Sequence, residues 1–191
     1  ETAVLWEVAS GREVRRFEGR SGWAVPLSFS PDEQFVLIED RGGFVRLWDT
    51  RTGQVMLKFS KQRTMVVAVS PGGRFVVTGV GDGTAILWEG ATGREARRFT
   101  GHTGPVSRVA FSPDGQFVLT GSSDTTARLW MAQPYQVVRQ FSNRSQVNCV
   151  AFSPNEPYVL TAADKMAYLW DLQTRQNIRQ FNGHLGTVSA V

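Results

Sequence analysis

Apolar residues occur in short runs along the chain and not at helical spacing. Runs such as Phe35–Ile38, Phe75–Thr78 and Phe117–Thr120 are rich in the aromatic and β-branched residues that suit a pleated, half-buried surface. Turn-forming triplets such as Pro113-Asp114-Gly115 and Gly81-Asp82-Gly83 separate the runs. No segment keeps a 3.6-residue period over helical length. The pattern therefore predicts an all-β chain of short antiparallel strands, four in each unit.

The units repeat at a nearly constant spacing. Tryptophan recurs every 40 or 42 residues, always after a leucine, at Trp6, Trp48, Trp88, Trp130 and Trp170. A phenylalanine follows each tryptophan eleven residues later, at Phe17, Phe59, Phe99, Phe141 and Phe181. A fixed period of about 40 residues is typical of architectures in which similar supersecondary units stack side by side.

The residues that carry the repeat resemble a known family. Four of the five Leu-Trp pairs are followed by an acid, and Gly101-His102 heads the unit that ends at Leu129-Trp130. Units of this length with these ends resemble the WD-repeat β-propeller. The resemblance covers essentially the whole chain. It implies a propeller with four complete four-stranded blades and partial blades at both termini.

The resemblance also divides the chain, as one propeller domain over residues 1–191. It places a partial blade at 1–17, full blades at about 23–59, 64–99, 106–141 and 147–181, and a partial blade at 187–191. Blades bury their faces against neighbours, so an open set would leave two apolar faces in water. Three alternatives follow: further blades lie outside this sequence, further copies complete a homo-oligomeric ring, or the chain closes as an irregular five-membered ring.

One blade carries the full set of four residues that often locks a blade in this family. The set is His102, Thr120, Asp124 and Trp130, and the resemblance implies a buried hydrogen-bond relay among them. A histidine, a hydroxyl and a carboxylate also permit a catalytic interpretation. We favour the structural one, because the threonine is expected between strands without access to solvent. The blade around Trp48 keeps only the tryptophan.

The family's binding contacts concentrate at the start of the first strand of a blade and just before the turn between its second and third strands. On this sequence, those positions give the candidate partner-binding residues Trp23, Val25, Arg41, Arg63, Met65, Ser107, Gln146 and Asn148. Trp23 lies in a glycine-containing loop outside the repeated tryptophan position. Large aromatic residues and arginines anchor many interfaces. The alternative is that Trp23 folds over its own blade.

Charge adds a second hypothesis about the partner. The chain carries a net charge of +4, and many arginines lie in the expected outer strands, which permits a nucleic-acid-binding propeller. Acids such as Glu13 and Glu95 are interleaved, however, and no aromatic platform for bases accompanies the arginines. Charges on an exposed edge strand also prevent edge-to-edge aggregation. We favour that structural interpretation.

Other chemistry is absent from the sequence. Cys149 is the single cysteine, and no phosphate loop, dinucleotide fingerprint, zinc spacing or calcium loop is present. No apolar run is long enough to span a bilayer, and the first residues do not form a secretory signal. We therefore expect a cytoplasmic protein without metal or cofactor and without membrane contact. The favoured function is a non-catalytic protein-interaction scaffold, or the sensor segment of a signalling protein, that binds a protein or peptide on the propeller face.

Overall fold

The computed structural model describes residues 2–18, 25–30, 32–39, 44–58, 64–132 and 137–190. For Val25, Pro26, Thr64 and Met65 only the backbone is described. The strands are β1 (Thr2–Trp6), β2 (Glu13–Glu18), β3 (Val25–Phe29), β4 (Phe35–Glu39), β5 (Val45–Asp49), β6 (Val55–Lys58), β7 (Thr64–Val69), β8 (Phe75–Val80), β9 (Ala85–Glu89), β10 (Glu95–Phe99), β11 (Val106–Phe111), β12 (Phe117–Ser122), β13 (Thr126–Met131), β14 (Val137–Ser142), β15 (Val147–Phe152), β16 (Tyr158–Ala163), β17 (Met166–Asp171) and β18 (Asn177–Phe181). One 3₁₀ turn, η2 (Pro71–Gly73), precedes β8.

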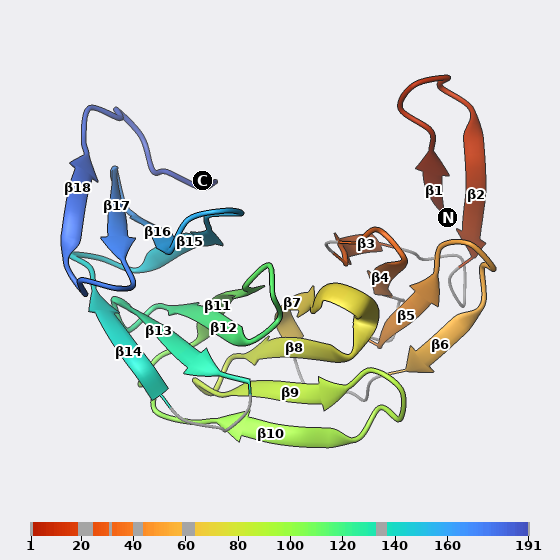
Figure 1. Ribbon diagram of the computed structural model, residues 1–191, viewed down its shortest axis with the longest axis horizontal. Coiled ribbons are helices and arrows are strands. Elements are labelled where there is room, and N and C mark those ends of the chain that lie inside the picture. Colours follow the sequence, from red (N-terminus) through yellow and green to blue (C-terminus); the bar gives the residue numbers. More distant parts are fainter. Residues whose placement is uncertain are drawn as a thin grey trace.

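These strands form four antiparallel four-stranded sheets and one antiparallel pair. The sheets are β3–β6, β7–β10, β11–β14 and β15–β18, and the pair is β1–β2. Each sheet is a simple meander, because connections of a few residues join only antiparallel neighbours. In every sheet the first strand lies on the inner rim of the molecule and the fourth on the outer rim (Figure 1). The all-β propeller fold predicted from the sequence is confirmed.

The sheets lie side by side along an arc. The β1–β2 pair is at one end and the sheet β15–β18 is at the other, with the arc open between them (Figure 1). The described residues therefore do not close into an irregular five-membered ring. Completion by further blades or by further copies stays a prediction.

The C-terminal segment differs from its expectation. Residues 187–190 were expected to begin a strand, but they form none. Instead the amide of Val188 donates to the carbonyl of Asp164 at 2.7 Å, and the Val188 side chain is buried against Ala162 and Ala167. A first strand pairs only with the second strand of its own sheet, and no such partner follows within the described chain. The segment is therefore docked on β15–β18 without strand pairing.

The core lies between neighbouring sheets. Val77 and Leu87 of one sheet pack against Val106 and Val118 of the next, and all four are fully buried. The repeated phenylalanines contribute to the same joints: the exposed fractions of Phe17, Phe99 and Phe141 are 2%, 3% and 1%. Phe181 holds the same place in the last sheet and is 40% exposed. A blade face is thus buried where a next sheet follows it and open to solvent at the end of the arc.

Gly90 is required by a close approach within the second full sheet. Its amide donates to the carbonyl of Arg74 at 2.7 Å. In the other sheets the amides at the same place donate to the carbonyls of Gln34, Gln116 and Pro157. In this sheet alone the 3₁₀ turn brings a backbone oxygen against the position, and a Cβ on Gly90 would lie 1.8 Å from the carbonyl oxygen of Gly73.

We therefore expect Gly90→Ala to lower the free energy of unfolding by about 3 kcal/mol, because the turn must move to admit the methyl group. The control is Gly186→Ala, since no atom lies within 4 Å of a Cβ at Gly186. Urea denaturation of both variants measures the difference. Equal stability of the two variants would contradict the close approach.

Candidate functional site

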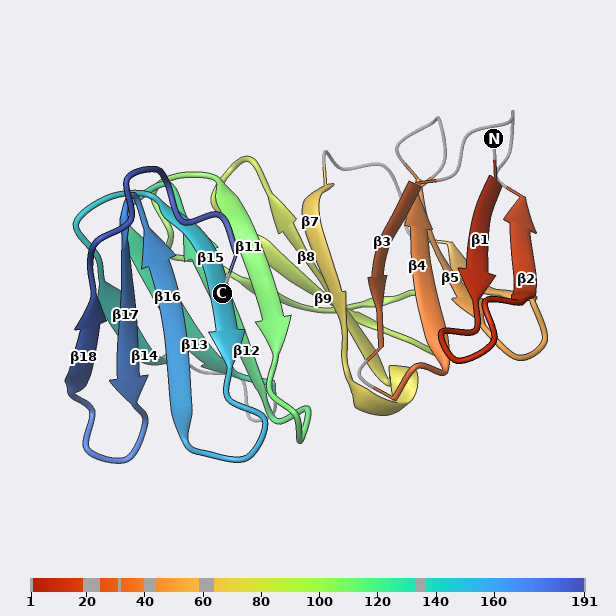
Figure 2. The ribbon, with the colours of Figure 1, turned by 90° about the horizontal axis from the view of Figure 1, so that it is seen from above.

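Antiparallel meanders give the arc two distinct faces. The turns between first and second strands and between third and fourth strands share one face, and the remaining connections share the other (Figure 2). We call the first the turn face; its described turns are 7–12, 32–34, 50–54, 70–74, 90–94, 112–116, 153–157 and 172–176. We call the second the relay face; its described segments are 81–84, 100–105, 123–125, 143–146, 164–165 and 182–187.

The four residues of the expected relay meet beneath the relay face. Nδ1 of His102 lies 2.8 Å from Oδ2 of Asp124, and Nε2 lies 2.7 Å from Oγ1 of Thr120. The indole N–H of Trp130 donates to the same hydroxyl at 2.9 Å. Thr120 therefore donates to a neutral imidazole whose Nδ1–H faces the carboxylate, and each polar side-chain group of the relay has a partner.

Electrostatics agree with this protonation state. Burial lowers the pKa of His102 below its usual 6.5, although the neighbouring Asp124 acts in the opposite direction. Burial alone would raise the pKa of Asp124, but hydrogen bonds from Thr126, His102 and the amide of Thr103 outweigh it and lower that pKa to about 2. The His102 and Asp124 side chains are 1% and 5% exposed. With so little exposure, the group joins the 100–105 segment to the 123–125 turn and offers a substrate no access.

The other sheets keep parts of the same arrangement. In β15–β18 Asn143 stands in for the histidine, and its side-chain oxygen accepts from Thr161 at 2.8 Å, while Trp170 donates to Thr161 at 2.9 Å. In β3–β6 Ile38 occupies the threonine position, and the buried Trp48 Nε1 has no hydrogen-bond partner within the described chain. Within the described chain, the complete relay of histidine, threonine, aspartate and tryptophan is found in β11–β14.

We expect Thr120→Val to destabilise the protein by about 3 kcal/mol, because it leaves the Trp130 N–H buried and unpaired and removes the imidazole's donor. Thr92→Val removes an exposed hydroxyl that donates to Glu89, and it should cost less than about 0.5 kcal/mol. Chemical denaturation measures both. A Thr120→Val cost no larger than the control would show that the relay carries no stability.

Acidification should weaken the fold through the same residues. Below pH 6.5 the unfolded chain binds a proton at His102 that the folded chain excludes, so the free energy of unfolding falls as the pH falls. A second loss follows below pH 3.8, where Asp124 binds a proton only when unfolded until about pH 2. His102→Asn copies the Asn143 arrangement and should flatten the decline in the free energy of unfolding that begins below pH 6.5. Urea midpoints at several pH values test this, and an unchanged slope would contradict it.

The expected partner-binding residues are only partly visible. Trp23, Arg41 and Arg63 lie outside the described residues, and Val25 and Met65 have only their backbones described, near the relay-face ends of β3 and β7. On the same face Gln146 is exposed and Asn148, two residues on, is half-buried.

The structure corrects the expected role of Ser107. It was expected on the binding surface, but it is buried, and its hydroxyl donates to the carbonyl of Val147 at 3.0 Å. Since Val147 begins the next sheet, Ser107 belongs to the joint between sheets. The strand start faces a neighbouring sheet at this residue, so its hydroxyl is not presented to a partner.

Two outer-strand arginines have a role that sequence reasoning missed. The Arg15 guanidinium donates to the carbonyls of Thr50, Arg51 and Thr52, and Arg139 donates to the carbonyl of Arg175. Each reaches the outer turn of the next sheet and satisfies backbone oxygens there. The available signal was the recurrence of arginine two residues before the repeated phenylalanine. Elsewhere Arg16 pairs with Glu13 and Arg98 with Glu95.

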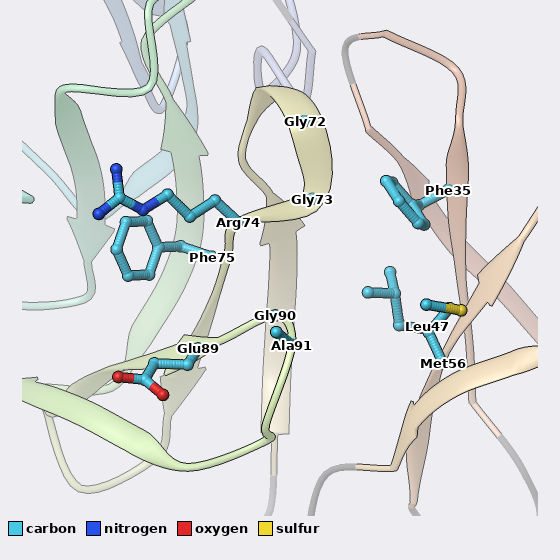
Figure 3. A pocket seen from close by; sticks show the side chains of 10 residues that line it. All are labelled: Phe35, Leu47, Met56, Gly72, Gly73, Arg74, Phe75, Glu89, Gly90 and Ala91. Atoms are coloured by element: carbon cyan, nitrogen blue, oxygen red, sulfur yellow. The ribbon is translucent and has the colours of Figure 1, made fainter.

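The turn face has a pocket at each joint between full sheets, and none was expected from the sequence. The first, of about 380 Å³, lies between β3–β6 and β7–β10. Phe35, Leu47 and Met56 line one side, and residues 72–75 and 89–91 of the next sheet line the other, with the Arg74 and Phe75 side chains pointing away from those three residues (Figure 3). The second and third pockets, of about 280 and 310 Å³, occupy the next two joints. Turns of different units build each pocket, so no single unit reveals one.

Among the described ranges, no three His, Cys, Asp or Glu side chains gather closely enough to hold a metal ion. The same ranges contain no helix with the length and apolar character needed to cross a bilayer.

Stacked four-stranded meanders with a buried His-Thr-Asp-Trp relay define a repeat protein of the β-propeller class. Residues 55–89, 93–131 and 135–171 match the family model described as WD domain, G-beta repeat. These three matches cover more than half of the chain, and the chain belongs to the WD40 family.

Three curated relatives show how far the similarity extends. The chain is 32% identical over 85 residues to the transcriptional repressor rco-1 of Neurospora crassa, which covers 41% of this chain and 14% of that protein. It is 25% identical over 112 residues to the guanine nucleotide-binding protein G(I)/G(S)/G(T) subunit beta-1 of Homarus americanus, covering 56% and 33%. The chain is also 26% identical over 112 residues to the guanine nucleotide-binding protein subunit beta-1 of Caenorhabditis briggsae, again covering 56% of this chain and 33% of that protein. The chain thus spans about a third or less of the length of these relatives.

Proposed function

We propose that this chain is a non-catalytic scaffold that binds a protein or peptide partner on its relay face. Membership of the WD40 family supports a role in protein interaction, and so do relatives named as a transcriptional repressor and as subunits of guanine nucleotide-binding proteins. The fold itself allows many functions, so the function has to be inferred from particular residues on the surface.

The observation that carries this proposal is the way Gln146 and Asn148 are held. They flank Val147, whose side chain is fully buried and whose carbonyl accepts the Ser107 hydroxyl from the preceding sheet. The backbone between the two polar side chains is therefore fixed from below. Side chains presented on a rigid backbone lose little conformational entropy on binding, which favours recognition of a partner.

The relay supports the same use of this face. The Asp124 carboxylate accepts from the amide of Thr103, so the 100–105 segment and the 123–125 turn are tied together at the surface. The proposed scaffold requires no cofactor and no catalytic group. A cytoplasmic location and a homo-oligomeric ring stay predictions. The arginine contacts described above give no support to the nucleic-acid alternative, because Arg15 and Arg139 are bonded to backbone oxygens.

A photo-crosslinking amino acid at position 146 tests the proposal in the cell that makes the protein. We expect a discrete adduct from position 146 and none from position 140, where an exposed glutamine lies on the outer strand β14. Asn148→Arg in the position-146 background should abolish the adduct, because a longer charged side chain would block the same surface. Equal labelling from both positions, or an adduct that survives Asn148→Arg, would contradict binding at this site.

A further inference from the structure

The three pockets of the turn face adjoin one another. Arg74 and Phe75 line both the first and the second pocket, and Asp114 lines both the second and the third. The pockets therefore form one continuous surface that crosses three joints, from β3–β6 to β15–β18. We call this surface the track.

The two ends of the track are mainly apolar, although Glu89 lines the first pocket and Glu156 lines the third. Met56, 52% exposed, stands beside Phe35 and Leu47 at the first pocket (Figure 3). At the third pocket the half-buried Phe152 and Leu172 supply the apolar lining. The second pocket lies between them and is lined mainly by polar and charged groups.

The middle of the track presents one charge of each sign. The exposed Arg74 side chain lies over the Phe75 ring, 5.1 Å from its centroid, and makes no ion pair within the described chain (Figure 3). Oδ1 of Asp114 accepts from the Ser112 hydroxyl and the Gln116 amide, whereas Oδ2 accepts nothing from the described residues.

The first full sheet shows why Oδ2 of Asp114 has no donor among the described residues. Asp32 holds the corresponding place, and its Oδ2 accepts the amide of Gly72 from the next sheet at 2.8 Å. The turn that faces Asp114 supplies no such amide among the described residues. Asp114 therefore keeps an acceptor directed to solvent at the mouths of two pockets.

The spacing of the pockets sets the length of chain that could occupy the track. Packed sheets lie about 10 Å apart, and two sheets separate the first pocket from the third, so the distance between these pockets is about 20 Å. An extended peptide advances about 3.3 Å per residue. About six residues would therefore connect the two apolar ends.

We propose that the track binds an extended peptide segment of a protein partner. Two apolar side chains about six residues apart enter the first and third pockets, an acidic residue faces Arg74, and a basic residue faces Asp114. The order of charges along the peptide selects the partner, because the reversed order would set like charges against each other. This site lies on the face opposite the one proposed above and is a second interaction surface.

The probes are the heptapeptide Leu-Ser-Asp-Ser-Lys-Ser-Leu and its charge-reversed form Leu-Ser-Lys-Ser-Asp-Ser-Leu, because an extended peptide can lie along the track in either of two directions. Binding to the 191-residue chain is followed by NMR up to 5 mM peptide. We expect one of the two to bind at least ten-fold more tightly than the other and than a version with serine at both ends. No saturable binding of either peptide would overturn the proposal, as would equal binding of both.

Variants of the chain test where the better peptide binds. Met56→Asp should weaken it at least ten-fold. Val138→Asp is the matched control, because Val138 occupies the same bulge position of its outer strand, is 44% exposed and does not line the track. Arg74→Gln and Asp114→Asn should each reduce the preference for one charge order, while Arg94→Gln and Asp82→Asn should not.

Two further results would also overturn the proposal. If Val138→Asp weakens binding as much as Met56→Asp, the peptide does not occupy the track. If Met56→Asp changes the sedimentation of the protein and peptide binding is unaffected, the first pocket is a contact between copies and the proposal is wrong. Asn148→Arg should leave heptapeptide binding unchanged, so failure of the track and failure of the relay-face proposal are separately visible.

Discussion

The structure depends on the packing of one four-stranded sheet against the next. A sheet of this size has two apolar faces and cannot bury either by itself, so stability comes from the joints. Val77, Val106 and Val118 show what a joint supplies: fully buried side chains from two sheets in one cluster. The difference between Phe141, which is buried, and Phe181, which is 40% exposed, shows what is lost where no next sheet follows.

Polar groups at the joints have to be satisfied as strictly as apolar groups are packed. The turns of each sheet expose carbonyls and amides close to a neighbouring sheet, and an unpaired buried group would cost free energy. Arg15 supplies donors to one such turn, Asp32 supplies an acceptor to another, and Ser107 bonds across a third joint. The relay of His102 and Thr120 completes a sheet from within. Apolar packing positions the sheets, and these bonds fix their turns.

Much of this follows from the sequence, because the signals are local and repeated. The runs beginning at Phe35, Phe75 and Phe117 are strands, and the family resemblance named the four residues that meet at His102. The contacts that sequence reasoning missed join different units. Nothing near Arg15 in the sequence indicates that it reaches the turn at Thr50, and nothing near Ser107 indicates that its hydroxyl donates a hydrogen bond to the carbonyl of Val147. The pockets were missed for the same reason.

The joints also explain how one small fold can carry two separate surfaces. Each joint extends from the relay face to the turn face, so the same packing that fixes the backbone at Val147 fixes the pocket between Phe117 and Phe152. A rigid joint presents both surfaces without requiring a conformational change in either. The two surfaces differ because side chains at turns are free to vary where they are not needed for packing. Gly72 closes one joint through Asp32, while the corresponding oxygen of Asp114 is left open, and so a small change in one turn distinguishes a structural contact from a surface able to bind.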